Sequence, residues 1–323
     1  MYLFELVGED DAFAVYEAAV ASEGIHRVGP GLAVARTVSP VVAHLAFTRC
    51  VSDFLVDAPA TLDGIYEAVA SRSLDRSGSA AVRARAIRGA RIDSRAIERR
   101  LGNILVDEGL QIDLEAPDHV LRVVTAGERA YIGWQLIEPG DAFSQRRPTD
   151  RPFFQPGSMA PRLARALVNI AGIREADVLV DPMCGTGGIL LEGGLVGARV
   201  IGLDMQRRMV EGARRNCRAI TPGARVELIV GDARALPVQA GMVRAVVFDA
   251  PYGRQSRVTA RDRDALVREA LKEAHDVTAS AVVVADRSLT VIAEDCGWTV
   301  RATFVRRVHR SLDRHIHHLT AAG

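Results

Sequence analysis

Val178-Leu-Val-Asp-Pro-Met-Cys-Gly-Thr-Gly-Gly-Ile-Leu-Leu191 joins a short apolar run, a glycine-rich turn and a second apolar run. A short apolar run that stops at an acid predicts a buried strand. Glycines in the turn that follows let the backbone approach a ligand and leave the amides of a helix N-terminus free to bind it. The stretch therefore predicts a strand, a turn and a helix of a parallel α/β sheet, with a ligand at the turn.

Two further apolar runs also end at an acid. Residues 199–203 lead to Asp204, about 20 residues after the glycines, where an acid can accept hydrogen bonds from both ribose hydroxyls. Residues 226–230 lead to Gly231 and Asp232, which is placed to receive an adenine amino group. Because parallel strands end at one edge of a sheet, these acids predict a nucleoside-binding site along that edge.

The fourth apolar run, residues 244–248, ends in Asp249-Ala-Pro-Tyr252. An aromatic amine is a poor nucleophile, so a site that alkylates it accepts hydrogen bonds from both N–H groups and aims the nitrogen at the electrophile. The Asp249 carboxylate and the Ala250 carbonyl are two suitable acceptors. Pro251 makes the turn rigid, and Tyr252 offers a stacking face. The tetrapeptide indicates chemistry on a planar amino group; an ordinary strand-to-loop turn is the alternative.

These motifs together resemble those of class I S-adenosylmethionine-dependent methyltransferases. The tetrapeptide resembles the Asp/Asn-Pro-Pro-Tyr/Phe signature of amino-methyltransferases, with Ala250 in place of the first proline. The carbonyl survives this change, so we expect a looser turn and a retained function. Upstream, Arg151-Pro-Phe-Phe-Gln-Pro-Gly-Ser-Met159 and Pro161-Arg-Leu-Ala-Arg-Ala-Leu-Val168 resemble the loop and helix before the first strand in archaeal tRNA guanine-N2 methyltransferases acting at position 10. The whole chain is similar to that family.

The resemblance implies a Rossmann-like α/β domain with a seven-stranded, mostly parallel sheet, and S-adenosylmethionine as the cofactor. It implies methyl transfer to N2 of a guanine in tRNA, with dimethylguanosine as the end product. It assigns catalysis to Asp249, Ala250, Pro251 and Tyr252. It assigns cofactor binding to Asp181, Pro182, Cys184, Gly185, Gly187, Asp204, Met205, Asp232 and Ala233.

Several other functions are weighed against this one. A nicotinamide-binding turn lacks support because Leu190 stands where its third glycine belongs, and a P-loop lacks its lysine because Lys272 is the chain's single lysine. An amino-methyltransferase of another tRNA guanine, DNA adenine or protein glutamine stays open. So does a non-catalytic RNA-binding protein.

The charge is distributed unevenly along the chain, although its net value is only +1. Residues 1–25 hold six acids and neither lysine nor arginine, whereas residues 72–100 hold nine arginines and three acids. Such asymmetry is typical of a polyanion-binding face. Arg83 and Arg85 alternate with small apolar residues as in a strand, and Arg95 and Arg99 project from the helix that follows. We predict that these four arginines bind tRNA; a merely solvated surface is the alternative.

The order of predicted elements divides the chain into four parts. A small N-terminal α/β unit has expected strands at residues 32–38 and 41–47. The next part resembles a THUMP domain in its order of elements and its arginines, which implies docking on the acceptor end of tRNA. The parts are residues 1–49, this THUMP-like domain at 50–138, a linker at 139–151 and the methyltransferase domain at 152–323.

Composition limits what else the chain can be. Its 48% hydrophobic and 25% charged residues are ordinary for a globular protein, and the absence of a leader or a long apolar stretch predicts a cytoplasmic protein without a membrane span. Four scattered cysteines favour neither disulfides nor zinc. The histidines near the C-terminus lack acidic or cysteine partners at ligand spacing, so no metal is expected. The sequence indicates no obligatory protein partner and leaves a small activating partner open.

Overall fold

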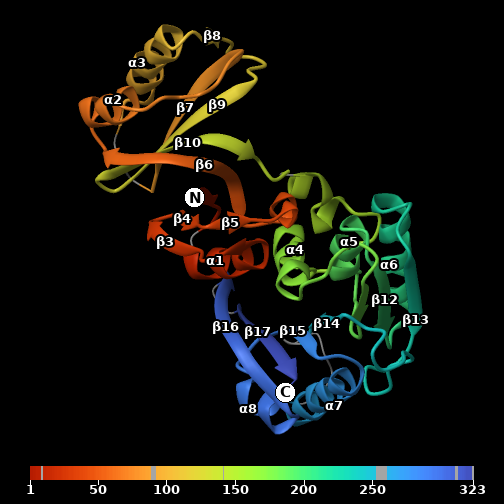
Figure 1. Ribbon diagram of the computed structural model, residues 1–323. Coiled ribbons are helices and arrows are strands. Elements are labelled where there is room, and N and C mark those ends of the chain that lie inside the picture. Colours follow the sequence, from red (N-terminus) through yellow and green to blue (C-terminus); the bar gives the residue numbers. More distant parts are fainter. Residues whose placement is uncertain (9, 89–91, 141, 252–259, 310–311, 322–323) are drawn as a thin grey trace. The chain divides into compact units, whose positions relative to one another are not determined.

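The computed structural model describes residues 1–323 apart from 9, 89–91, 141, 252–259, 310–311 and 322–323. The chain divides into two compact units, unit 1 (Met1–Gly140) and unit 2 (Asp141–Gly323) (Figure 1). The division falls within residues 139–151, a segment rich in proline, glycine and charge. Each unit is built on its own large sheet.

Unit 2 contains a seven-stranded sheet in the order β13-β12-β11-β14-β15-β17-β16. The first five strands of that order run parallel, and β17 and β16 run antiparallel to their neighbours. The strands are β11 (Val178–Asp181), β12 (Arg199–Asp204), β13 (Val226–Val230), β14 (Ala245–Asp249), β15 (Ser280–Ala285), β16 (Trp298–His309) and β17 (Leu312–Ala321). The Rossmann-like fold expected from the sequence is confirmed.

The strand order of unit 2 reverses between β11 and β14. From β11 the chain builds outward through β12 and β13, and then returns to place β14 on the other side of β11. Ligands of open α/β sheets bind at such a reversal, beyond the carboxyl ends of the strands. The helices of this unit are α4 (Pro161–Ile170), α5 (Gly188–Leu195), α6 (Arg207–Ile220), α7 (Ala260–Val277) and α8 (Thr290–Asp295), preceded by the short 3-10 turns η3 (Ala142–Arg146) and η4 (Pro148–Asp150).

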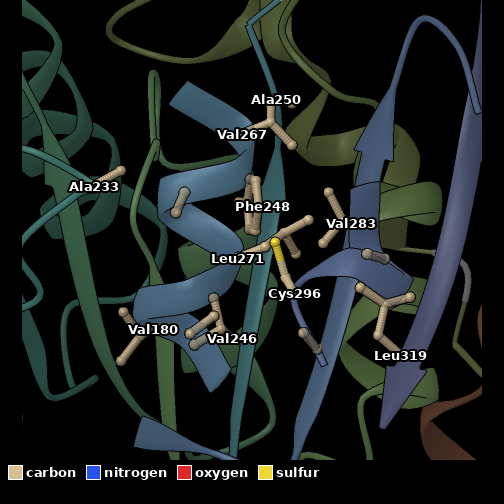
Figure 2. Packing of buried hydrophobic residues seen from close by; sticks show 14 of the residues in the cluster. Val180, Ala233, Val246, Phe248, Ala250, Val267, Leu271, Val283, Cys296 and Leu319 are labelled. Carbon is tan, nitrogen blue, oxygen red and sulfur yellow. The ribbon is translucent and has the colours of Figure 1, made fainter. Parts of the chain in front are cut away.

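Strands β11, β14 and β15 contribute to one apolar cluster with α7 (Figure 2). Phe248 of β14 is fully buried in it, and Val267 and Leu271 of α7 belong to the same cluster. Phe248 immediately precedes Asp249, so the packing of its ring fixes where β14 ends. The core therefore sets the position of the predicted catalytic segment.

Replacing Phe248 by alanine is expected to lower the free energy of unfolding by about 3 to 5 kcal/mol, because it leaves a cavity among rigid strands. Urea denaturation of the full-length chain measures this loss. Val291→Ala is the control, because that side chain is 69% exposed and truncating it removes little buried area. Equal effects of the two substitutions would contradict the role of Phe248.

Unit 1 contains an eight-stranded sheet in the order β3-β4-β1-β6-β10-β9-β7-β8. This sheet runs through residues 1–49 and 50–138 alike, because β6 pairs with β1 on one side and β10 on the other. Its elements are β1 (Tyr2–Leu6), α1 (Asp11–Ala18), η1 (Ala19–Ala21), β2 (Ser22–Glu23), β3 (His26–Gly29), β4 (Leu32–Ala35), β5 (Thr37–Val38), η2 (Pro40–His44), β6 (Thr48–Pro59), α2 (Leu62–Ala70), β7 (Ser79–Ile87), α3 (Ser94–Asp107), β8 (Gln111–Ile112), β9 (His119–Ala126) and β10 (Arg129–Ile137). Strands β2 and β5 form a separate small ladder.

The strand expected at residues 41–47 is wrong. Pro40 opens the 3-10 turn η2 instead, since its fixed φ and missing N–H suit the first turn of a helix. The amides of Ala46 and Phe47 donate to the buried Glu17 carboxylate, each at 2.7 Å, rather than to a neighbouring strand. A distant side chain thus satisfies the backbone groups that would otherwise need a ladder.

Helix α3 begins after the N-cap residue Asp93 and ends before a glycine, and both are local signals in the sequence. The Asp93 carboxylate accepts a hydrogen bond from the Ala96 amide at 3.0 Å, and Gly109 follows the helix with a φ of +90°. The side chains Ile97, Leu101 and Leu105 are buried against the sheet. None of the helices in the described part of the chain is long and apolar enough to cross a membrane.

Candidate active site

A cavity of about 250 Å³ opens at the carboxyl edge of the sheet in unit 2. The ends of β11, β12 and β14 and the turn before α5 line it, together with residues 155–159 upstream of α4. The lining residues are Gln155, Pro156, Gly157, Ser158, Met159, Asp181, Met183, Cys184, Gly185, Thr186, Gly188, Ile189, Asp204, Gln206, Met209, Asp249, Ala250 and Pro251. The cavity therefore lies at the reversal of strand order.

The glycine turn is held open by its backbone conformation. Gly185 and Gly187 have φ values of +51° and +80°, in the left-handed region that favours glycine. A Cβ on Gly187 would also lie 3.2 Å from the Cβ of Ala213, so α6 closes the space behind the turn. The turn is tied to β12 because the Gly185 amide donates to Asp204 Oδ2 at 3.1 Å.

Two acids, the buried Asp181 and the half-buried Asp204, contribute carboxyl groups to the cavity. Burial raises the pKa of Asp181 well above its usual value, and the neighbouring charges of Asp249 and Asp204 raise it further. The Met183 amide partly opposes this by donating to Asp181 Oδ1 at 3.1 Å. Burial also raises the pKa of Asp204, against hydrogen bonds from the Gln206 and Gly185 amides. A cation in this cavity would relieve the repulsion between these acids.

Asp249, the last residue of β14, also lines the cavity. Its Oδ2 is 3.5 Å from Nη2 of Arg314, and the same nitrogen donates to the Gly157 carbonyl at 3.1 Å. The following Ala250 amide donates to the Val284 carbonyl of β15 at 2.8 Å, so the chain leaves the sheet only after Ala250. Tyr252 lies outside the described residues.

The structure brings only some of the predicted cofactor residues to the cavity. Asp181, Cys184, Gly185 and Asp204 line it, as do three residues of the predicted catalytic segment. The predicted residues absent from the described lining are Pro182, Gly187, Met205, Asp232 and Ala233. Gly187 is instead the N-cap residue of α5, Met205 is 63% exposed, and Ala233 is buried in the apolar cluster.

Asp232 has a local partner, Arg234. Its carboxylate accepts hydrogen bonds from the Arg234 guanidinium at 2.6 and 3.0 Å. This contact lowers the pKa of Asp232, whose side chain is 30% exposed. Asp232 follows β13, an edge strand of the sheet, whereas the described lining comes from the ends of β11, β12 and β14.

The residues that sequence reasoning missed come from residues 155–159, from the glycine turn and the start of α5, and from the segment after β12. A buried amide ties the segment just before residues 155–159 to the glycine turn: Asn216 Nδ2 donates to the Phe153 and Thr186 carbonyls, each at 2.9 Å. The hydroxyls of Ser158 and Thr186 also lie 3.0 Å apart. For residues 155–159 the signal in the sequence was the Pro156-Gly157 pair, which lies in a segment that resembles the methyltransferase family. The missed lining residues are Gln155, Pro156, Gly157, Ser158, Met159, Met183, Thr186, Gly188, Ile189, Gln206 and Met209.

The arginines predicted to bind RNA fall into two classes. On β7, Arg83 donates to the Leu114 carbonyl at 2.5 Å, and Arg85 lies 3.6 Å from the buried carboxylate of Glu5. On α3, Arg95 and Arg99 are exposed. Neither forms an ion pair or a hydrogen bond within the portion of unit 1 that the structure describes. Only the helical pair is thus fully available to a ligand.

Known proteins are similar to this chain in sequence and in fold. Residues 148–316 match the family model described as RMKL-like, methyltransferase domain. The chain is 39% identical over 291 residues to the tRNA (guanine(10)-N2)-dimethyltransferase of Methanothermobacter thermautotrophicus, covering 88% of this chain and 81% of the relative. It is 34% identical over 253 residues to the enzyme of the same description from Pyrococcus abyssi, covering 76% and 74%. The chain belongs to this family of tRNA methyltransferases.

Solved structures agree on the fold. TrmN from Thermus thermophilus aligns with a TM-score of 0.55 at 21% identity and covers 99% of each chain. A putative methyltransferase complexed with SAH aligns with a TM-score of 0.53 at 15% identity and covers 100% of this chain and 98% of the other. At these identities the likeness concerns the fold alone.

The cavity fits S-adenosylmethionine, the cofactor of this family. Asp181 and Asp204 offer negative charge to a cationic ligand, and Ile189 and Met209 offer apolar surface for a purine. Both Asp204 oxygens already accept one backbone N–H each. A carboxylate oxygen has a second acceptor site, so Asp204 can still receive ribose hydroxyls.

The affinity for S-adenosylmethionine is expected to fall as the pH is lowered, starting above the range in which an exposed aspartate takes up its proton. The pKa of Asp181 is raised, so this carboxyl becomes neutral first and no longer attracts a cation. Calorimetric titration across neutral and mildly acidic pH measures the effect. The dependence of affinity on pH should flatten in Asp181→Asn and persist in Asp295→Asn, whose carboxylate lies outside the cavity lining and pairs with Arg268. A wild-type affinity independent of pH would contradict it.

Proposed function

We propose that the protein methylates the exocyclic N2 of guanine at position 10 of tRNA and carries the reaction to dimethylguanosine. One observation supports the chemistry above all: Asp249, Ala250 and Pro251 line the same cavity as the acids Asp181 and Asp204. An amine acceptor and a cofactor site thus share one compartment. The two relatives described as guanine(10)-N2 dimethyltransferases support the position and the number of methyl groups.

The protein contributes mainly orientation and charge. S-adenosylmethionine, when bound, supplies an electrophilic methyl group on a cationic sulfur. Asp181 and Asp204 hold the cationic ligand, and the Asp249 carboxylate accepts one amino N–H of the guanine. The Ala250 carbonyl is the second acceptor. Fixing both N–H groups leaves the nitrogen lone pair aimed into the cavity, and Asp249 is placed to take up the proton that the amine releases.

A second methylation follows from the same contacts. A monomethylated amine keeps one N–H and can rotate about its bond to the ring. Asp249 can then accept the remaining N–H while the new methyl group turns away. The cavity edge therefore allows two successive transfers at one nitrogen.

We also propose that unit 1 binds the body of the tRNA, through a THUMP-like module at residues 50–138. A folded tRNA buries its base edges, so the target guanine has to be flipped out to reach the cavity. The sequence predicts that the flipped base stacks on Tyr252. The arginines of α3 are the surface of unit 1 best suited to hold phosphates.

Asp249→Asn is expected to lower the turnover of tRNA methylation by about 100- to 1000-fold, because the amide cannot take up a proton and is a poorer acceptor. Mass spectrometry of nucleosides from tRNA incubated with protein and cofactor measures the product and its position. The affinity for the cofactor should stay nearly unchanged.

Asp295→Asn serves as the matched control, since it makes the same chemical change at the end of α8, outside the cavity lining. Less than tenfold loss in Asp249→Asn would show that Asp249 does not accept the amine. Methyl transfer to DNA or to protein, with none to tRNA, would overturn the proposed substrate.

Arg95→Gln with Arg99→Gln is expected to raise the Michaelis constant for tRNA and to leave cofactor binding unchanged. Each lost phosphate contact should flatten the logarithmic salt dependence of tRNA binding by about 0.7 to 0.9. Filter binding across a salt series measures the slope.

Arg129→Gln is the control for this pair. It removes an arginine of the same unit whose guanidinium forms an ion pair with Asp57. If the double variant keeps the wild-type slope on full-length tRNA, α3 does not contact phosphates. The assignment of the cavity in unit 2 would stand in that case.

A further inference from the structure

We propose that Arg314 is the positioning residue of this active site, and that it acts by holding the Asp249 carboxylate and the loop of residues 155–159 in one geometry. The inference rests on the proposed function, because it assigns a task in the same methyl transfer. Arg314 comes from β17, near the C-terminal end of the chain, and was not among the residues predicted from the sequence.

One guanidinium nitrogen makes both contacts. Nη2 of Arg314 lies 3.1 Å from the Gly157 carbonyl and 3.5 Å from Asp249 Oδ2. The Arg314 side chain is only 6% exposed, so it reaches these partners from within the protein. Since Gly157 and Asp249 both line the cavity, Arg314 connects two of its walls from behind.

The strand register explains why an arginine at this position can reach the site. Asp249 of β14 pairs with Val284 of β15, and Val284 pairs in turn with Ile316 of β17. Because β17 runs antiparallel, Arg314 lies two residues beyond Ile316 toward the carboxyl ends of β14 and β15. Its side chain therefore begins at the catalytic edge of the sheet, two strands away from Asp249.

The contact between Arg314 and Asp249 also offsets negative charge in the cavity. Asp181, Asp204 and Asp249 line one cavity, and the charges of Asp249 and Asp204 add to burial in raising the pKa of Asp181. A buried guanidinium beside Asp249 offsets part of this repulsion when no cationic ligand is bound. It also restricts the carboxylate to one orientation, which an acceptor of a particular N–H requires.

The second contact fixes the opposite wall. Residues 155–159 also touch the glycine turn through Ser158 and Thr186, whose hydroxyls lie 3.0 Å apart. Arg314 is thus a bridge between the amine acceptor and a loop joined to the cofactor turn. Reacting groups misplaced by about 1 Å can cost roughly 100-fold in rate, so losing this bridge should lower turnover.

The test compares Arg314→Gln and Arg314→Lys with Arg301→Gln in the full-length protein. Arg301 is an exposed arginine of β16 in the same hairpin and provides the matched control. We expect Arg314→Gln to lower the turnover of tRNA methylation about 10- to 100-fold, with the affinity for S-adenosylhomocysteine within about threefold of wild type. Arg314→Lys keeps the charge and should recover part of the rate.

A double-substitution cycle separates positioning from simple stability. If Arg314 acts through Asp249, adding Arg314→Gln to Asp249→Asn should lower single-turnover rates far less than it does in the wild type. Arg314→Gln should also be rescued in part by added guanidinium, which a merely misfolded protein would not show.

Three outcomes would overturn the inference while wild-type tRNA methylation persists. They are turnover of Arg314→Gln equal to that of Arg301→Gln, full additivity in the double-substitution cycle, and a loss of cofactor affinity as large as the loss of turnover. A wild-type protein that transfers no methyl group to tRNA would instead remove the proposed function itself. The two failures are therefore distinguishable.

Discussion

Three carboxylates, Asp181, Asp204 and Asp249, meet in one cavity at the carboxyl ends of β11, β12 and β14, and holding them there is the constraint on which the site of unit 2 depends. Burial alone disfavours charge on Asp181, and its two acidic neighbours add to the cost. Such a cluster is tolerable where backbone amides donate to the acids and a cationic ligand completes the site. The glycine turn supplies one of those amides at Gly185, and β17 supplies a guanidinium at Arg314.

The same constraint makes the site composite. The acids come from parallel strands, but residues 155–159 come from the segment before the first strand and Arg314 comes from the last. Asn216 of α6 ties the early segment to the turn through three hydrogen bonds with Phe153 and Thr186. Parts distant in sequence thus meet at one sheet edge, and small changes in either would alter the cavity without touching the acids.

How far the sequence predicts this arrangement depends on the range of the contacts involved. Strand ends in unit 2 are marked locally by an apolar run followed by an acid, and β11 and β13 have the predicted bounds. The helix cap at Asp93 is equally local. Contacts between distant residues have no such local signal. The sequence near Pro40 does not indicate that the Glu17 carboxylate accepts hydrogen bonds from the amides of residues 46 and 47. Asp232 shows the opposite case, in which Arg234, two residues away, engages the predicted ligand group.

The charge asymmetry of the sequence has a partly internal explanation. Within unit 1, acids of residues 1–25 pair with arginines of the basic segment, residues 72–100. Glu5 pairs with Arg85, and Asp11 pairs with Arg88. Arg122 of β9 adds two hydrogen bonds to Glu5 at 2.7 and 2.8 Å, so that buried acid is already well compensated. The local excess of positive charge in the sequence is therefore larger than the positive charge that is free to bind a polyanion. Subtracting the described arginines of this segment that have side-chain partners leaves Arg72, Arg95 and Arg99, and it is this remainder that a polyanion could contact.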